Sequence, residues 1–117
     1  GKIINFGVRF SFVSNPSFSL IDSRIAAEQV VRDYFDRRKY NFGESIDKTE
    51  IIRLLNDTEQ VGDVLKFEVY SVFGGVYSDI EYDFIKNTTS DDRKVMIPDN
   101  YVFEIKLYNT NITGEAF

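Results

Sequence analysis

The chain contains no cysteine, no histidine and no tryptophan, and it has one methionine and two prolines in 117 residues. Without cysteine there is no disulfide framework, no thiolate nucleophile and no cysteine metal site. Without histidine the chain lacks the commonest general base and the commonest transition-metal ligand. We therefore expect a protein that is not an enzyme and that binds no cofactor and no transition metal.

Positive charge is also scarce, because 14 Lys and Arg face 19 Asp and Glu and the net charge is −5. Binding to a phosphate backbone requires clustered basic side chains, so we expect no nucleic-acid partner. No apolar run approaches the roughly 18 residues of a membrane span, and we expect no membrane partner either. At 117 residues the chain has the size of one domain. We expect 1–117 to be a single domain from a larger protein, because a strand pattern starts almost at once.

What the chain does have is a heavy aromatic content, with 11 Phe and 7 Tyr. Residues 3–13 alternate between apolar and polar side chains, as in a strand with one buried face. The side chains expected to face inward are Ile4, Phe6, Val8, Phe10 and Phe12. Those expected to face outward are Asn5, Gly7, Arg9 and Ser11.

Two consecutive helices are expected after this strand, at 20–38 and 47–58. Each begins with the pattern of a capping box, Ser19 with Asp22 and Asp47 with Glu50. The second helix carries an apolar stripe at helical spacing, and we expect both Leu54 and Leu55 to be well covered.

Strands are expected at 64–73, 76–85 and 101–108. Gly74 and Gly75 separate the first two, and two glycines between strand patterns indicate a hairpin turn. The inward side chains of the strand at 64–73 are expected to be Leu65, Phe67, Val69 and Phe73. The tail 109–117 shows no clear period.

These elements predict an α+β fold in the order β-α-α-β-β-β. We expect a two-layer sandwich in which the two consecutive helices pack on one mostly antiparallel sheet of about four strands. The outward positions of the sheet carry mixed charge, which suits cross-strand ion pairs on a solvent-facing surface. These positions include Arg9, Lys66, Glu68, Glu104 and Lys106.

Asp79, Glu81 and Asp83 recur with period two, so a strand would present all three carboxylates on one face. Such a row offers oxygen ligands for a hard cation. Successive members would lie some 6–7 Å apart on a strand, however, which is too far for one ion without further ligands. A solvated edge that discourages aggregation is the simpler interpretation, and no nucleophile stands beside a recognisable base.

Three tyrosines are expected on outward faces, where an isolated domain gains little from them. Tyrosine is enriched at protein interfaces because its ring is apolar and its hydroxyl tolerates water. We therefore predict docking onto other protein chains through the sheet edge, the glycine turn and the tail. The candidate interface residues are Tyr70, Gly74, Gly75, Tyr77, Tyr108 and Phe117.

The order of these parts resembles the C-terminal region of phage baseplate wedge proteins, the J-like components of contractile tails. The resemblance rests on an aromatic-rich helix end, a glycine before a polar-capped helix, and a valine step into a strand. The matching residues are Tyr34, Phe35, Phe42, Gly43, Ile46, Ile51, Ile52, Val61 and Val64. The ending is similar to that of the T4-like branch, through Ile97, Pro98, Phe103, Glu104, Ile105, Asn111, Ile112 and Gly114.

The resemblance implies a C-terminal domain with a structural role in the virion. Such a protein is assembled in the host cytoplasm and docks onto other copies of itself, as a dimer or ring, and onto other baseplate wedge proteins. The alternative is a small ligand- or protein-binding module of unrelated origin, also without catalysis. In that alternative the loop 86–94 is the only candidate rim of a pocket.

Overall fold

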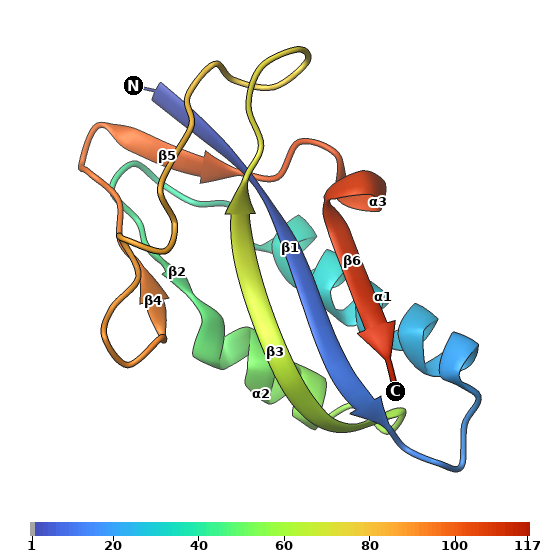
Figure 1. The fold of residues 1–117 in the computed structure, drawn as a ribbon. Coiled ribbons are helices and arrows are strands. Elements are labelled where there is room, and N and C mark those ends of the chain that lie inside the picture. The colour runs from blue at the N-terminus through green and yellow to red at the C-terminus, as the bar shows by residue number, and fades with distance from the viewer. Residues whose placement is uncertain (1) are drawn as a thin grey trace.

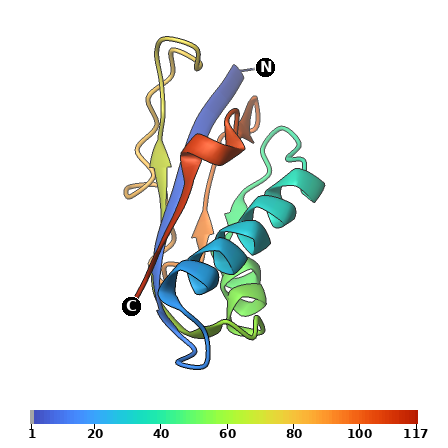
Figure 2. The same ribbon diagram turned by 90° about the vertical axis from the view of Figure 1, so that its right-hand side faces the viewer.

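The computed structural model describes residues 2–117 and has helices packed on one face of a mixed sheet (Figure 1 and Figure 2). In chain order the elements are β1 (Lys2–Ser14), α1 (Leu20–Arg37), β2 (Ile46–Asp47), α2 (Lys48–Asn56), β3 (Val61–Ser71), β4 (Lys94–Val95), β5 (Tyr101–Glu104), α3 (Tyr108–Asn111) and β6 (Ile112–Ala116). The expected α+β class, with two consecutive helices on a sheet of about four strands, is confirmed.

The sheet is built around β1, which lies between β3 and β6 (Figure 1) and pairs at its N-terminal end with β5. β3 pairs with it antiparallel along one edge, whereas β5 and β6 pair with it parallel. β5 pairs with Lys2–Asn5 and β6 with Val8–Phe12. The sheet is therefore mixed and not mostly antiparallel. β2 and β4 form a separate two-stranded antiparallel pair.

The alternation of β1 is confirmed on its inner face, where all five expected side chains are buried. On its outer face Arg9 is exposed, as expected, but Asn5 and Gly7 are buried. The reason is that the chain beyond β3 and the Tyr70 ring of β3 itself both cover this end of β1. The Asn5 Oδ1 atom accepts a hydrogen bond from the Ser78 amide at 2.7 Å, and the Tyr70 ring covers Gly7.

The predicted strand at 76–85 is wrong, because this segment has no regular structure. Gly74 and Gly75 do turn the chain with positive φ, at 77° and 58°. The turn closes on itself, however, with the Gly74 amide donating to the Ser78 carbonyl at 2.8 Å. Further along, the Tyr82 amide donates to a side chain, the Ser71 hydroxyl, at 3.0 Å. Amides of this segment thus donate to side chains, and not to the backbone carbonyls of β3 with which a return strand would pair.

β3 departs from its expected alternation at Leu65. Ser11 of β1 lies opposite Lys66 and Phe12 lies opposite Val64, so Leu65 is an extra residue in the ladder. Such a bulge leaves one residue unpaired and re-aims its side chain. Leu65 is accordingly exposed and not inward. Phe67 is buried and Val69 half-buried, as expected, whereas Phe73 lies beyond the strand and is exposed.

The C-terminal tail also differs from expectation, because most of it is the strand β6. The Phe117 amide donates to the Phe12 carbonyl at 2.9 Å, and the Ser14 amide donates to the Phe117 carbonyl at 2.9 Å. The tail therefore extends the sheet of its own chain. Its sequence, Ile-Thr-Gly-Glu-Ala, has too few apolar residues to show a strand period.

Both helices begin where their caps predict. The Ser19 hydroxyl accepts from the Asp22 amide at 3.0 Å, and the Asp47 carboxylate accepts from the Thr49 amide at 3.0 Å. α1 packs against β6 and α2 against β3, so both helices lie on the same side of the sheet (Figure 2). Leu55 of α2 is fully buried, as expected, while Leu54 is only half-buried.

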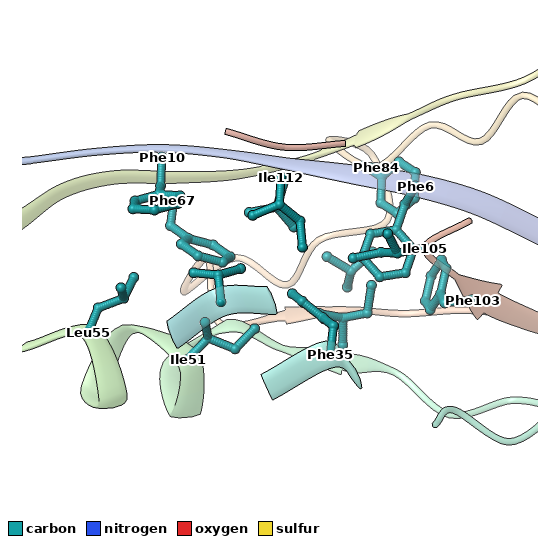
Figure 3. Close-up of a cluster of buried hydrophobic side chains, with 14 of the residues drawn as sticks. Phe6, Phe10, Phe35, Ile51, Leu55, Phe67, Phe84, Phe103, Ile105 and Ile112 are labelled. Carbon is teal, nitrogen blue, oxygen red and sulfur yellow. The ribbon is translucent and has the colours of Figure 1, made fainter. Parts of the chain in front are cut away.

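The core between the two layers is strongly aromatic at one end (Figure 3). Phe6 meets Phe35 edge-on at 5.4 Å between ring centroids and Phe103 at 5.9 Å. Phe84, from the irregular segment, stacks on Phe103 at 5.5 Å. Phe84 thus attaches the segment between β3 and β4 to the core.

Tyr40 borders this aromatic cluster, and its hydroxyl is buried with no protein hydrogen-bond partner among residues 2–117. Burial raises the pKa of Tyr40. The neutral phenol is therefore retained in the folded state, while an unfolded tyrosine ionises near pH 10. Above about pH 10 the unfolded chain loses a proton that folded Tyr40 keeps, so the free energy of unfolding falls as the pH rises further.

Tyr40→Phe is therefore expected to leave the free energy of unfolding at pH 7 unchanged or raised, because it removes an unpaired buried hydroxyl. Urea unfolding at pH 7 and again above pH 10 is the measurement. The variant's advantage over wild type should grow with pH. A variant less stable than wild type at both pH values would show that the hydroxyl has a partner.

Candidate docking groove at the free edge of β3

A groove of about 1210 Å³ runs along the edge of β3 that faces away from β1. β3 forms one wall, and parts of the irregular segment, 81–85, 88–90 and Asp92, form the opposite wall. Lys48 and Ile52 of α2 and Val95 of β4 also line it. The groove exists because the predicted return strand at 76–85 is absent, which leaves this edge of β3 without a neighbour among residues 2–117.

The backbone of every second residue of β3 points into this groove. The Val72 amide donates toward β1, to the Asn5 carbonyl at 3.2 Å. In the opposite direction, the Phe67 carbonyl accepts from the Lys48 ammonium at 3.5 Å. Because neighbouring residues of a strand alternate in direction, the amides and carbonyls of Phe67, Val69 and Ser71 face the groove.

Apolar side chains rim the groove on both sides. Leu65 projects from the β3 bulge with 56% of its surface exposed, and Phe73 is exposed beyond the end of β3. Ile85, on the opposite wall, is 91% exposed. All three line the groove. Exposed apolar side chains gathered at one site are typical of binding surfaces.

Charged side chains on the outer face of the sheet border the groove next to this rim. Glu68 accepts from Lys66 at 2.7 Å and from Arg9, across the strands, at 2.8 Å. These two cations, Lys66 foremost, lower the pKa of the Glu68 carboxyl. The Arg9 guanidinium also lies over the Tyr70 ring, 4.6 Å from its centroid. The expected cross-strand ion pairing is thereby confirmed for Arg9 and Glu68.

Lys48 is the charged residue whose side chain enters the groove from the helix layer. It is only 5% exposed, and it is the one charged residue in the buried class among residues 2–117. Its ammonium contacts the Asp92 carboxylate at 2.6 Å. Asp92 itself is 80% exposed at the side chain and adopts a φ of 60° in the loop before β4. No sequence pattern singles out Lys48, because its neighbours mark only a helix start.

The six predicted interface residues do not gather at one place. Tyr70 is the only one of them that lines the groove. Gly74 and Gly75 form the turn beyond the end of β3. Phe117 lies beside Ser14 at the end of β6, with its side chain exposed.

The two other tyrosines make contacts within the chain. The Tyr77 hydroxyl lies 3.2 Å from the Asn111 side-chain oxygen and donates to it. The Tyr108 hydroxyl donates to the Phe35 carbonyl at 3.3 Å. Both residues are half-buried. Their part in docking stays a prediction.

The period-two row of Asp79, Glu81 and Asp83 is not formed, since these residues are not in a strand. Asp83 accepts from the Lys86 amide at 2.9 Å and so stabilises a turn. Among residues 2–117 no group of three or more acidic side chains is placed to hold a metal ion.

Comparison with known proteins finds no match to a family model, to a curated protein or to a solved structure. Across residues 2–117, no helix combines the length and the apolar character that crossing a membrane requires. The groove is therefore the feature of the molecule from which a function can be inferred.

Proposed function

We propose that this domain is a non-catalytic docking module that accepts an extended segment of another protein chain along the free edge of β3. The observation that carries the proposal is the unpaired backbone of Phe67, Val69 and Ser71 inside an apolar-rimmed groove. Strand addition uses such groups, because the edge amides and carbonyls supply affinity and side-chain pockets supply specificity.

The other edge of the sheet supports this choice, because a side chain of α1 already bonds one of the outward amides of β6. The Gly114 amide of β6 points away from β1 and donates to the Glu28 carboxylate of α1 at 2.8 Å. Glu28 is held in turn between Arg24 and Arg32, at 3.7 and 4.0 Å. Natural sheets protect edges that must not pair. Here the Glu28 carboxylate of α1 bonds the edge formed by β6, whereas the edge formed by β3 opens into the groove.

The shape of the groove favours a single strand over a second sheet. Residues 81–85 and 88–90 wall the groove on the side opposite β3. An incoming strand therefore has β3 on one side and this wall on the other. A tail or loop of a neighbouring chain meets that constraint.

We further propose that the docking serves assembly of a contractile-tail baseplate wedge. The support for this setting is the sequence resemblance described above. Its partners would be other copies of the chain and other wedge proteins, in the virion. Repeated docking in such an assembly tolerates a small interface, because linked sites raise the effective concentration of each contact.

Val69→Pro tests the docking edge. Proline removes the amide that faces the groove, and it is tolerated at edge positions that donate nothing to the ladder. The probe is a yeast-displayed library of random peptides of roughly ten residues, long enough for one strand. Wild type should enrich peptides with alternating apolar side chains, and Val69→Pro should bind none of them while keeping the wild-type circular dichroism spectrum.

The matched control is Val69→Ala, which keeps the amide and shortens the same side chain. It should bind the selected peptides. Equal binding by wild type and Val69→Pro would reject the edge as the docking site, as would a wild-type selection that enriches nothing.

A further inference from the structure

Lys48 breaks two local rules at once. A charge is costly to bury unless it is fully paired and hydrogen-bonded, yet Lys48 is 95% covered and its one carboxylate partner, Asp92, lies mostly in solvent. It is also the first residue of α2, where the helix dipole disfavours a positive charge. Places where a chain violates local rules are expected to be functional sites.

The hydrogen bonds of the Lys48 ammonium leave part of its capacity unused. An ammonium has three donors. One reaches Asp92 at 2.6 Å, and a second makes a long contact of 3.5 Å with the Phe67 carbonyl on the groove edge. The amide of a strand added to β3 would approach that carbonyl from the groove side, where the ammonium now lies, and would displace this long contact. The ammonium would then need an acceptor from the added strand.

We propose, on the basis of the docking function above, that Lys48 makes the groove select an extended protein segment carrying an Asp or Glu side chain opposite it. The carboxylate supplies the acceptor that the buried ammonium lacks once the Phe67 carbonyl is taken. A segment with an apolar or basic side chain at that position leaves the buried ammonium with Asp92, which lies mostly in solvent, as its one acceptor. Lys48 therefore both attracts the right segment and excludes others, as specific interfaces do.

A side-chain carboxylate fits better than the carboxylate of a chain end. The groove continues past Lys48 in both directions along β3, toward Val64 and toward Phe73. A segment lying along the whole groove passes Lys48 in its middle. Its terminal carboxylate would fall beyond the groove.

The test uses the peptides selected on wild type. They should share an Asp or Glu at one position, and the amide version of the best peptide, Asp→Asn or Glu→Gln, should bind wild type roughly ten- to a hundredfold more weakly. Lys48→Met keeps the aliphatic stem and removes the charge. It should bind the acidic and amide peptides equally.

Three results would overturn the inference. Selected peptides without a shared acidic position would reject it while leaving the docking function standing. If wild type and Lys48→Met prefer the acidic peptide over its amide version by the same factor in affinity, a group other than Lys48 binds the carboxylate. Failure of wild type to select any peptide over Val69→Pro would reject the docking function and this inference together. If Lys48→Met does not fold, Lys48→Arg replaces it. Wild type and Lys48→Arg should both bind the acidic peptide more tightly than its amide version, and equal affinity for the two peptides would reject the inference.

Discussion

Phe6→Ala is expected to lower the free energy of unfolding by about 3–5 kcal/mol, a range typical of aromatic truncation in a core. Phe6 is fully buried at the centre of β1 and touches the rings of Phe35, Phe103 and Phe84. The substitution leaves a cavity where the helix layer, β5 and the irregular segment meet. Domains of this size are stable by about 5–15 kcal/mol, so the variant is expected to be marginal.

Urea unfolding followed by circular dichroism measures the effect. Phe42→Ala is the matched control, because Phe42 is mostly exposed and its truncation should change stability by no more than about 0.5 kcal/mol. Equal losses in the two variants would contradict the placement of β1 at the centre of the core.

Leu55→Ala is expected to lower the free energy of unfolding by about 2–5 kcal/mol, because it too leaves a cavity in the core. α2 is a short helix, and Leu55 and Ile51 are its fully buried apolar residues (Figure 3). Because α2 also carries Lys48, losing this anchor should loosen one side of the groove as well.

Leu54→Ala is the matched control, because it truncates the same type of side chain at the neighbouring position of α2. Leu54 is half-buried between the helices, so its truncation should cost clearly less than that of Leu55. The reverse order, measured by the same unfolding experiment, would mean that α2 is rotated about its axis.

The elements that the sequence predicts well are those set by local chemistry. The alternation of 3–13 predicts β1 and its inner face, because period two fixes which side chains share a face. Ser19 and Asp47 predict the two helix starts, because each side chain supplies an acceptor for an otherwise unpaired amide. These signals lie within a few residues of what they determine.

The failures are set by distant contacts. The segment 76–85 has a strand-like pattern, but its amides bond to Asn5 and Ser71, which only the folded sheet brings near. The tail has no period, yet β1 gives it a partner from Ile112 to Ala116. The strand order determines which edge of the sheet is open, and local sequence patterns do not specify the strand order. The groove and Lys48 therefore emerge only from the structure.

Docking by strand addition requires that the edge of β3 be open and accept a strand, and backbone amide hydrogen exchange over 66–72 measures both properties. In the free protein the amides of Glu68 and Tyr70, paired with β1, should exchange slowly, while those of Val69 and Ser71 should exchange rapidly. Binding of a selected peptide should slow Val69 and Ser71 to the rate of their neighbours. Uniform protection across these residues in the free protein, or no change at Val69 and Ser71 on binding, would contradict the account.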